Sequence, residues 1–194
     1  MNDLTELINQ YLKIFPQEAE RQKMLIEFLQ KNSDIINWNN FNGHIVAGGF
    51  IYAKKEGKFL VLYHKQLKMF LYPGGHIEKT DENTLNAAKR EIHEETGLEN
   101  LKQIKLLNNE LVPIDIDTHH IGYNTKLNLP EHYHFEFRYL FEIDKIQDIN
   151  LDEEESEEFK WIDISEMKQD KNYGKIADKI EKILNINLET EQER

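Results

Sequence analysis

Apolar side chains at the start of the chain recur with the spacing of an amphipathic helix. They predict one helix from Leu4 to Phe15, which Pro16 ends, and a second helix from Glu18 to Lys31. The residues on the apolar face of the second helix would be Met24, Leu25, Phe28 and Leu29. We expect the two helices to form a hairpin, residues 1–42, that packs on the rest of the chain as an N-terminal extension.

The loop after the second predicted helix carries two large aromatic residues, Trp38 and Phe41, which we expect to anchor the hairpin by packing. The hairpin itself contains no recognisable chemistry. Its simplest role is to cap one side of the domain, and we favour that role. The sharper alternative is a dimer surface or a lid over a substrate.

After residue 43 the pattern changes to short runs of β-branched and aromatic residues, which are typical of strands. The runs His44–Ala53 and Lys58–His64 flank Glu56-Gly57, a hairpin signal. The other predicted elements are strands at Gln103–Leu107, Pro113–His120 and His132–Ile143, an extended piece at Phe159–Ile162, and helices at Thr84–Thr96 and Lys175–Leu184. This alternation predicts an α/β fold around a mixed sheet, residues 43–187, followed by a frayed tail, residues 188–194.

Composition narrows the class of protein. The formal net charge of −12 excludes a protein that coats nucleic-acid backbones, but it permits a small phosphorylated ligand, because a divalent cation can reverse the local sign. The 39% of hydrophobic residues suffices for a sizeable core, and the absence of cysteine excludes disulfides and thiolate zinc sites. We find no signal-peptide pattern and no run approaching the roughly 20 apolar residues of a membrane span. We therefore expect a cytoplasmic protein with no membrane partner.

The helix predicted at Thr84–Thr96 is crowded with acidic residues. Each residue of an α-helix advances about 100°, so Glu91, Glu94 and Glu95 fall within roughly a quarter of the circumference. A separate apolar stripe, which can face a core, consists of Leu85, Ala88 and Ile92. Converging carboxylates repel one another, and their oxygens are hard ligands, so Mg²⁺ or Mn²⁺ is the expected partner. Taken alone, however, a Glu-rich helix more often presents a solvated face.

The residues around this helix resemble the signature of a known family. The run from Arg90 to Leu98, REIHEETGL, matches the second half of the Nudix box, Arg-Glu-U-x-Glu-Glu-x-Gly-U with U aliphatic, at every fixed position. Glu82 precedes Arg90 with seven residues between them, as the box requires. Six residues separate Gly75 from Glu82, whereas the standard box has five. The extra residue lies in the loop, so Asp81 competes with Glu82 for the first acidic role.

The resemblance covers roughly residues 43–184 and implies the Nudix α/β/α sandwich around a mixed sheet, with Mg²⁺ or Mn²⁺ as the cofactor. The residues that would bind the metal are Gly74, through the backbone carbonyl of a Pro-Gly-Gly turn, Glu91, Glu94 and Glu95. Glu91 would be the one that helps most to activate water. Arg90 would orient a glutamate as part of the catalytic machinery, and Glu82 would fasten the loop or Arg90.

A second polar group lies on the strand predicted at His132–Ile143. Alternate residues of a strand share a face, so one side is aromatic and typical of a core, and the other is polar. The polar side consists of His132, His134, Glu136 and Arg138, and the candidate neighbouring strand alternates in the same way with Asp115, Asp117 and His119. Such a wall could bind a phosphate or a second metal; the alternative is a solvent-facing surface with incidental salt bridges. The Gly-Gly-His of the box and this His-rich strand resemble one bacterial Nudix subgroup.

Two further positions are candidates for contacts with substrate or metal. His76, directly after Gly75, would contact phosphate or would be a simple loop residue. The acidic run Asp152–Glu158 is expected to be a solvated loop. Some Nudix enzymes take an additional metal-binding glutamate from a loop beyond the box, and Glu157 or Glu158 would serve here.

We therefore predict a Nudix pyrophosphohydrolase that cleaves the diphosphate bond of a nucleoside diphosphate linked to another moiety, by metal-assisted attack of water on phosphorus. The alternative from another class is a Nudix-like sensor that binds a nucleotide derivative without turnover. Such domains usually lose box glutamates, which this chain keeps. An isomerase on the same fold is disfavoured by the missing cysteine. The expected partner is a small nucleotide-type molecule and no nucleic-acid polymer, with a homodimer as a possible assembly.

Overall fold

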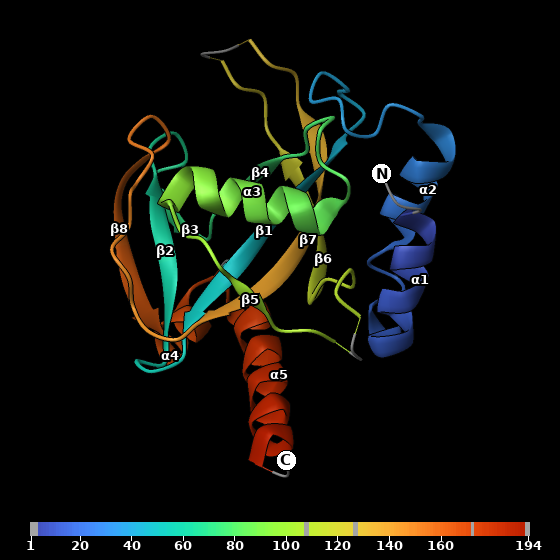
Figure 1. The fold of residues 1–194 in the computed structure, drawn as a ribbon. Helices are drawn as coiled ribbons and strands as arrows, with labels where there is room; N and C mark the ends of the chain where they lie inside the picture. Colours follow the sequence, from blue (N-terminus) through green and yellow to red (C-terminus); the bar gives the residue numbers. More distant parts are fainter. Residues whose placement is uncertain (1–3, 107–108, 126–127, 172, 193–194) are drawn as a thin grey trace.

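The computed structural model describes residues 4–106, 109–125, 128–171 and 173–192, with the backbone alone from residue 186. Within these ranges, strands form one mixed sheet and helices cover both of its faces (Figure 1). The strands are β1 (His44–Ala53), β2 (Lys58–His64), β3 (Met69–Leu71), β4 (Gly74–His76), β5 (Lys102–Gln103), β6 (Asp115–Ile121), β7 (His132–Ile143) and β8 (Ser156–Asp163). The predicted α/β fold around a mixed sheet is confirmed.

The sheet is built on its two longest strands, β1 and β7, which run parallel over ten residue pairs. The order across the sheet is β3-β2-β1-β7-β5. Three more strands pair antiparallel off this path: β4 with β1, β6 with β7, and β8 with β2. One end of the sheet is therefore made by β4, β1, β7 and β6, and the candidate site lies there.

Alternation along β7 separates two cores. The aromatic side, Phe135, Phe137, Tyr139 and Phe141, is buried as predicted and joins the core under α1 (Leu4–Ile14), α2 (Lys23–Lys31) and α3 (Thr84–Thr96). Phe28 of α2 stacks on Phe135 with ring centroids 4.6 Å apart, and the hydroxyls of Thr84 and Tyr139 are 2.6 Å apart. The other face packs Phe50 and its neighbours against α4 (Ile164–Gln169) and α5 (Gly174–Gln192). Helix α3 and the C-terminal helices thus lie on opposite faces.

Helix α3 begins and ends where the sequence predicts. Asn83 caps its N-terminus by accepting a hydrogen bond from the N–H of Asn86 at 2.9 Å. Gly97 ends it in the left-handed conformation, with φ of 68°, which a residue without Cβ adopts freely. The predicted stripe of Leu85, Ala88 and Ile92 is buried. The helix is therefore fixed on the sheet by its apolar side.

The N-terminal hairpin departs from the prediction in its second half. Pro16–Glu18 form a short 3₁₀ helix, η1, and α2 starts only at Lys23. The cause is a polar anchor: Gln22 is fully buried and donates a hydrogen bond to the carbonyl of Ile116 at 2.9 Å. This contact fixes the chain before α2 can begin. Only part of the expected apolar face of α2 is buried, and Met24 is 41% exposed.

The prediction that Trp38 and Phe41 anchor the hairpin is also wrong. Trp38 is 55% exposed and Phe41 is 39% exposed. Each ring meets a histidine at its edge, Trp38 with His76 at 6.4 Å and Phe41 with His132 at 6.2 Å between centroids. Since their other sides face solvent, these rings border a histidine-rich surface and do not hold the hairpin in place.

Several boundaries of the strands differ from the prediction. The Pro-Gly-Gly segment is not a turn, because Gly74–His76 pairs with β1 as strand β4. β5 contains only Lys102–Gln103, and Leu107 of the longer predicted strand lies outside the described residues. β8 takes in the end of the expected acidic loop, because it pairs along the length of β2.

The last helix is longer than predicted. α5 runs from Gly174 to Gln192, into the segment 188–194 that the sequence suggests is a frayed tail, and in Figure 1 it projects from the body of the molecule. Ile176, Ile180 and Ile183 are buried as predicted. In the described part of the chain, no helix combines the length and the apolar composition needed to cross a membrane.

Candidate active site

Strand β4 passes directly beneath the acidic side of α3. A Cβ atom on Gly75 would lie 2.6 Å from the Oε2 atom of Glu91, so the carboxylate rests where any side chain would stand. The N–H of Gly74 donates to Oε1 of Glu95 at 2.7 Å. Pairing with β1 holds the strand in this place, with Gly74 opposite Gly48. Gly75 therefore lets the backbone of β4 approach Glu91, and Gly74 lets β4 approach β1, because a Cβ there would lie 2.6 Å from Cα of Gly48.

Arg90 connects the acidic side chains of α3 to one another. Its Nη1 atom donates to Glu91 at 3.0 Å and to Glu94 at 2.7 Å, and its Nη2 atom donates to the backbone carbonyl of His76 at 2.7 Å. The guanidinium is mostly buried, at 20% exposed. It thus orients two glutamates, the role that the resemblance implies for it, and it also ties α3 to β4.

The loop before α3 supplies a third acidic residue that binds Arg90. Asp81 receives two hydrogen bonds from Arg90, at 3.2 Å from Nε and 2.9 Å from Nη2, in a bidentate pair. Asp81 also accepts the N–H of Glu78 at 2.8 Å, whereas Glu82 is exposed. The expectation that Glu82 binds Arg90 is therefore corrected. With one extra residue in the loop, Asp81 is the acid that contacts the guanidinium.

Burial changes the acidity of the two inner glutamates. It raises the pKa of Glu91 to about 7, although Arg90 opposes the shift. It raises the pKa of Glu95 to about 8, against the stabilising hydrogen bond from Gly74. Neighbouring carboxylates raise both values further. The two side chains thus share a site in which negative charge is costly, and a cation there would remove that cost.

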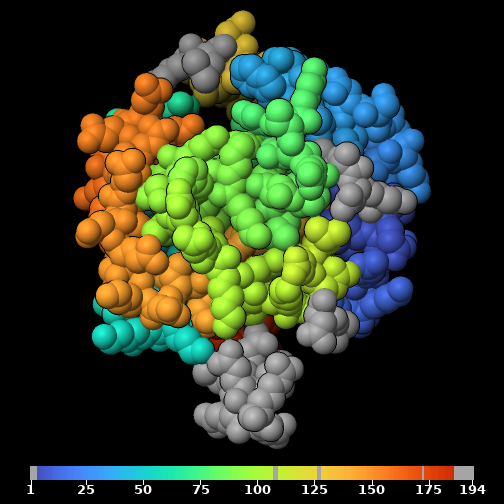
Figure 2. Space-filling view, viewed as in Figure 1, coloured from blue at the N-terminus to red at the C-terminus, as the bar shows by residue number. Residues whose placement is uncertain are grey.

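One of those neighbouring acids is a residue that sequence reasoning missed. Glu155 lies near enough to raise the pKa of both Glu91 and Glu95, although it is exposed, as is the candidate Glu158 on β8. The segment before β8 is attached to the end of α3, where the N–H of Asp152 donates to the carbonyl of Glu95 at 3.1 Å. Figure 2 shows this segment beside α3 on the same face of the molecule. A run of acidic residues does not by itself say which of them lies near the glutamates of α3.

Comparison with known proteins identifies the family. The NUDIX domain model matches residues 43–182, which is most of the chain. The chain belongs to the NUDIX domain family. A curated relative, the "Probable DHNTP pyrophosphohydrolase" of Lactococcus lactis subsp. cremoris, is 32% identical over 144 residues, which are 72% of this chain and 80% of the relative. Together they confirm the expectation that this chain is a Nudix pyrophosphohydrolase.

Solved structures agree on the fold. A NUDIX-family hydrolase from Clostridium perfringens superposes with a TM-score of 0.54 at 25% identity, covering 69% of this chain and 93% of its own. The dihydroneopterin triphosphate pyrophosphohydrolase of E. coli gives a TM-score of 0.52 at 17% identity, covering 73% of this chain and 95% of its own. The second similarity concerns the fold alone.

Away from the Nudix box, β6 and β7 pair as the alternation predicts. The facing pairs are Asp115 with Arg138, Asp117 with Glu136, and His119 with His134. Because these side chains alternate with the aromatic core residues of β7, they lie on the sheet face opposite to α3. The polar wall therefore lies on the other side of the sheet from the carboxylates of the Nudix box.

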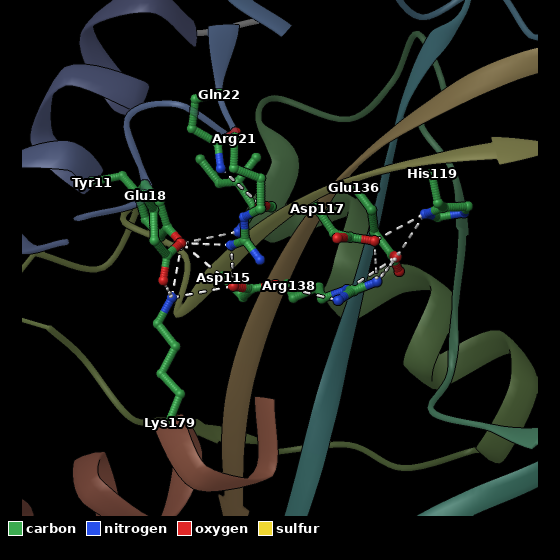
Figure 3. A network of polar contacts seen from close by, with 11 residues as sticks. Tyr11, Glu18, Arg21, Gln22, Asp115, Asp117, His119, Glu136, Arg138 and Lys179 are labelled. Carbon is green, nitrogen blue, oxygen red and sulfur yellow. Dashed lines mark hydrogen bonds and ion pairs between the residues drawn. The ribbon is translucent and has the colours of Figure 1, made fainter. Parts of the chain in front are cut away.

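Arg138 neutralises most of the acids of this wall. It donates to Asp115 at 3.2 Å, to Asp117 at 2.9 Å and to Glu136 at 2.9 Å (Figure 3). Its side chain is only 13% exposed, and Glu136 is buried. The wall is thus neither a plain solvent-facing surface nor an acidic pocket, but a compensated network.

Asp115 extends the network to both ends of the chain. Its carboxylate accepts hydrogen bonds from Arg21, before α2, at 2.6 Å and from Lys179, in α5, at 3.1 Å (Figure 3). Burial alone would raise the pKa of Asp115, but Lys179, Arg138 and Arg21 together hold it below its usual value. This one carboxylate thus joins the N-terminal hairpin, the sheet and the last helix.

The other end of the wall carries a cluster of histidines. His44 of β1, His76 of β4 and His134 of β7 each offer a ring nitrogen within 4.8 Å of the others, and His132 stands beside His134. Burial and the neighbouring histidines lower the pKa of His44 to about 4, that of His134 to about 2, and that of His76 as well. His76 is therefore a strand residue of this cluster, on the other face of β4 from the glycine contact with Glu91.

Proposed function

We propose that the protein is a divalent-metal-dependent pyrophosphohydrolase whose chemistry takes place on the acidic side of α3. The observation that carries the proposal is the pair of glutamates that lie against β4, of which Glu95 is buried and Glu91 is largely buried. Burying uncompensated carboxylates is unfavourable unless a cation joins them. A hydrolase of phosphoanhydrides needs such a cation, because water must reach phosphorus past negative oxygens.

The residues present fit Mg²⁺ or Mn²⁺. Both ions prefer oxygen ligands, and Mg²⁺ keeps several waters and needs few protein groups. The ligands we propose are Glu91, Glu94, Glu95 and the backbone carbonyl of Gly74, with Glu155 as an additional carboxylate close to them. When bound, the metal would neutralise phosphate oxygens and lower the pKa of the attacking water.

The chain's own residues would then position and deprotonate the water. Arg90 holds Glu91 and Glu94 in fixed orientations through its hydrogen bonds. Glu91 is the residue that we propose takes the proton of the attacking water, the role that the resemblance to Nudix enzymes implies for it. The water oxygen forms a bond to phosphorus, the bond from phosphorus to the bridging oxygen breaks, and two phosphate-bearing products leave.

The substrate we propose is a small nucleotide-type molecule with a di- or triphosphate. Dihydroneopterin triphosphate is the first compound to test, because the curated relative is named for this activity and shares 32% identity over most of both chains. A nucleoside diphosphate linked to another moiety is the wider class. The net charge of −12 does not suit a nucleic-acid polymer.

A substrate panel with Mg²⁺ tests the proposal. We expect turnover of dihydroneopterin triphosphate or of at least one nucleotide sugar, dinucleoside polyphosphate or nucleoside triphosphate. The loss of turnover on adding a chelator, and its return with Mg²⁺ or Mn²⁺, would establish the metal requirement. Binding of a nucleotide derivative by calorimetry without hydrolysis across the whole panel would instead favour the sensor.

A further inference from the structure

The histidine cluster at the end of the sheet has a feature that ordinary packing does not explain. His44 is 1% exposed, and neither of its ring nitrogens makes a hydrogen bond within the described residues. The carbonyl of Asn40 lies near enough to favour its protonated form, but it could satisfy only one nitrogen. A buried polar atom without a partner costs about 1–3 kcal/mol. At least one nitrogen of His44 therefore points to a partner of another kind.

Two other histidines converge on it from neighbouring strands. Residues His44, His76 and His134 share one sheet face because β1 pairs with β4 on one side and with β7 on the other. The register places His44 directly opposite His134, and ring centroids lie 4.7 Å apart. The His44 and His76 rings are 5.0 Å apart. Three imidazoles from three paired strands are thus held by the most regular part of the fold.

The position of His132 is a second geometric observation that favours a metal site. Its Nε2 atom lies 3.2 Å from Nε2 of His134, while its Nδ1 atom lies 2.8 Å from the carbonyl of Pro130. A carbonyl only accepts, so Nδ1 of His132 donates in this contact, and its Nε2 atom is the nitrogen that faces His134. Two nitrogens bound to one tetrahedral zinc lie about 3.3 Å apart, given bonds of about 2.0–2.1 Å. A backbone carbonyl on the other nitrogen is the usual outer support of a metal-binding histidine.

We propose that His44, His76 and His134, with His132 as the fourth ligand, bind a divalent transition metal of the zinc class, at a site separate from the Mg²⁺ site on α3. Neutral imidazole is the ligand that suits zinc and its neighbours in the periodic table, whereas carboxylates suit magnesium. His76 is exposed and gives the ion a way in.

A second group of potential ligands on the same wall does not qualify. Asp117, His119 and Glu136 also lie within 4.8 Å of one another. However, Arg138 donates to both carboxylates at 2.9 Å, so a cation already occupies the position that a metal would take.

Zinc binding by the full chain in excess Mg²⁺ tests this proposal. The metal-free protein is titrated with Zn²⁺ by calorimetry while Mg²⁺ saturates the carboxylates of α3. We expect one Zn²⁺ per chain, and a weakening of at least about tenfold in both His76→Ala and His134→Ala. His76 is exposed, so its variant should fold, which the melting temperature without metal would verify. Replacing Zn²⁺ with Co²⁺ should give the visible spectrum of tetrahedral nitrogen ligands in the parent protein and a weaker one in His76→Ala.

Two controls make the result unambiguous. His120→Ala removes an exposed histidine outside the cluster, near Glu131, and should bind Zn²⁺ like the parent. Glu95→Gln removes a carboxylate of α3 and should also keep the site. The proposal is overturned if no Zn²⁺ binds in excess Mg²⁺, or if both cluster variants bind it like the parent. It is equally overturned if Glu95→Gln loses Zn²⁺ while His76→Ala keeps it.

Discussion

Two groups of buried carboxylates in this molecule have opposite electrostatic surroundings. On α3, Glu91 and Glu95 are buried among other acids, and their pKa values are raised to about 7 and about 8. On β6, Asp115 is buried among Arg21, Arg138 and Lys179, and its pKa is lowered. Glu91 has Arg90 as a cationic partner, but the acids around the two glutamates outnumber it, whereas Asp115 has three cationic partners.

This difference distinguishes a binding site from a structural connection. Carboxylates that already have their cations within the chain stabilise the fold, and their neighbours cannot be removed one at a time without loss. Carboxylates without enough cations destabilise the fold until a ligand supplies the charge. The network around Asp115 is therefore expected to matter for stability, and the α3 site for activity.

The largest expected effect is on catalysis at α3. Glu95→Gln should reduce hydrolysis by at least about 100-fold, since even outer partners of metal ligands typically cost 10–100-fold. Its melting temperature without metal should not fall, because the neutral side chain removes the free-energy cost of burying a charge. Steady-state kinetics measures the loss of hydrolysis, and thermal unfolding measures the melting temperature. Retained activity would show that the metal lies elsewhere.

The converse substitution tests the other region. Asp115→Asn should lower the free energy of unfolding by about 3–5 kcal/mol, because it leaves buried cations without their shared partner. Denaturant unfolding measures this loss. Glu20→Gln, at an exposed ion pair with Lys23, is the control and should change stability by less than about 1 kcal/mol. Equal effects of the two variants would contradict the structural role of Asp115.

The pH dependence of stability should differ between the regions. A carboxyl whose pKa is higher in the folded chain binds more protons when folded, so its contribution is present below the ordinary value of 4.5. That contribution is lost as the pH rises through about 7 to 8. Without metal, the melting temperature should thus fall between pH 5 and pH 8, and a double Glu91→Gln, Glu95→Gln variant should fall less. Saturating Mg²⁺ should restore stability at pH 8. An identical pH profile for parent and double variant would rule out the raised pKa values.

A smaller effect tests the loop before α3. Asp81→Asn should lower kcat by roughly tenfold, the range expected for an outer support of metal ligands, because Arg90 loses its bidentate partner. Glu82→Gln, at the adjacent exposed position, is the matched control and should stay within about twofold. A larger loss in Glu82→Gln than in Asp81→Asn would return the acidic role to Glu82.

Much of the fold follows from periodicity. The limits of α3 and β7, and the separation of aromatic from polar residues along β7, were set by spacing that each element carries in its own sequence. The fixed positions of the Nudix box likewise brought Arg90 next to two glutamates. These are local relations, and the chain satisfies them wherever the element lies.

The rest depended on contacts between distant segments. Nothing in the sequence of β7 says which sheet face α3 covers, so the side of the sheet on which the polar wall lies could not be predicted. Gln22 and Lys179 look like ordinary surface residues until β6 brings Ile116 and Asp115 to them. In the acidic run, loop geometry brings Glu155 near Glu91 and Glu95. Contacts between distant segments and the directions of loops leave no periodic pattern in the sequence, so they could not be predicted from it.

Strand β4 also determines where this region tolerates a change in length. Gly75 touches Glu91 on one face, and His76 joins the histidines on the other, because neighbouring strand residues point in opposite directions. Inserting one residue into β4 would exchange the faces and set an imidazole against Glu91. In the loop a few positions later, an additional residue is accommodated, since Asp81 simply takes the place of Glu82. An insertion series through residues 74–82 should therefore show an abrupt boundary between intolerance and tolerance.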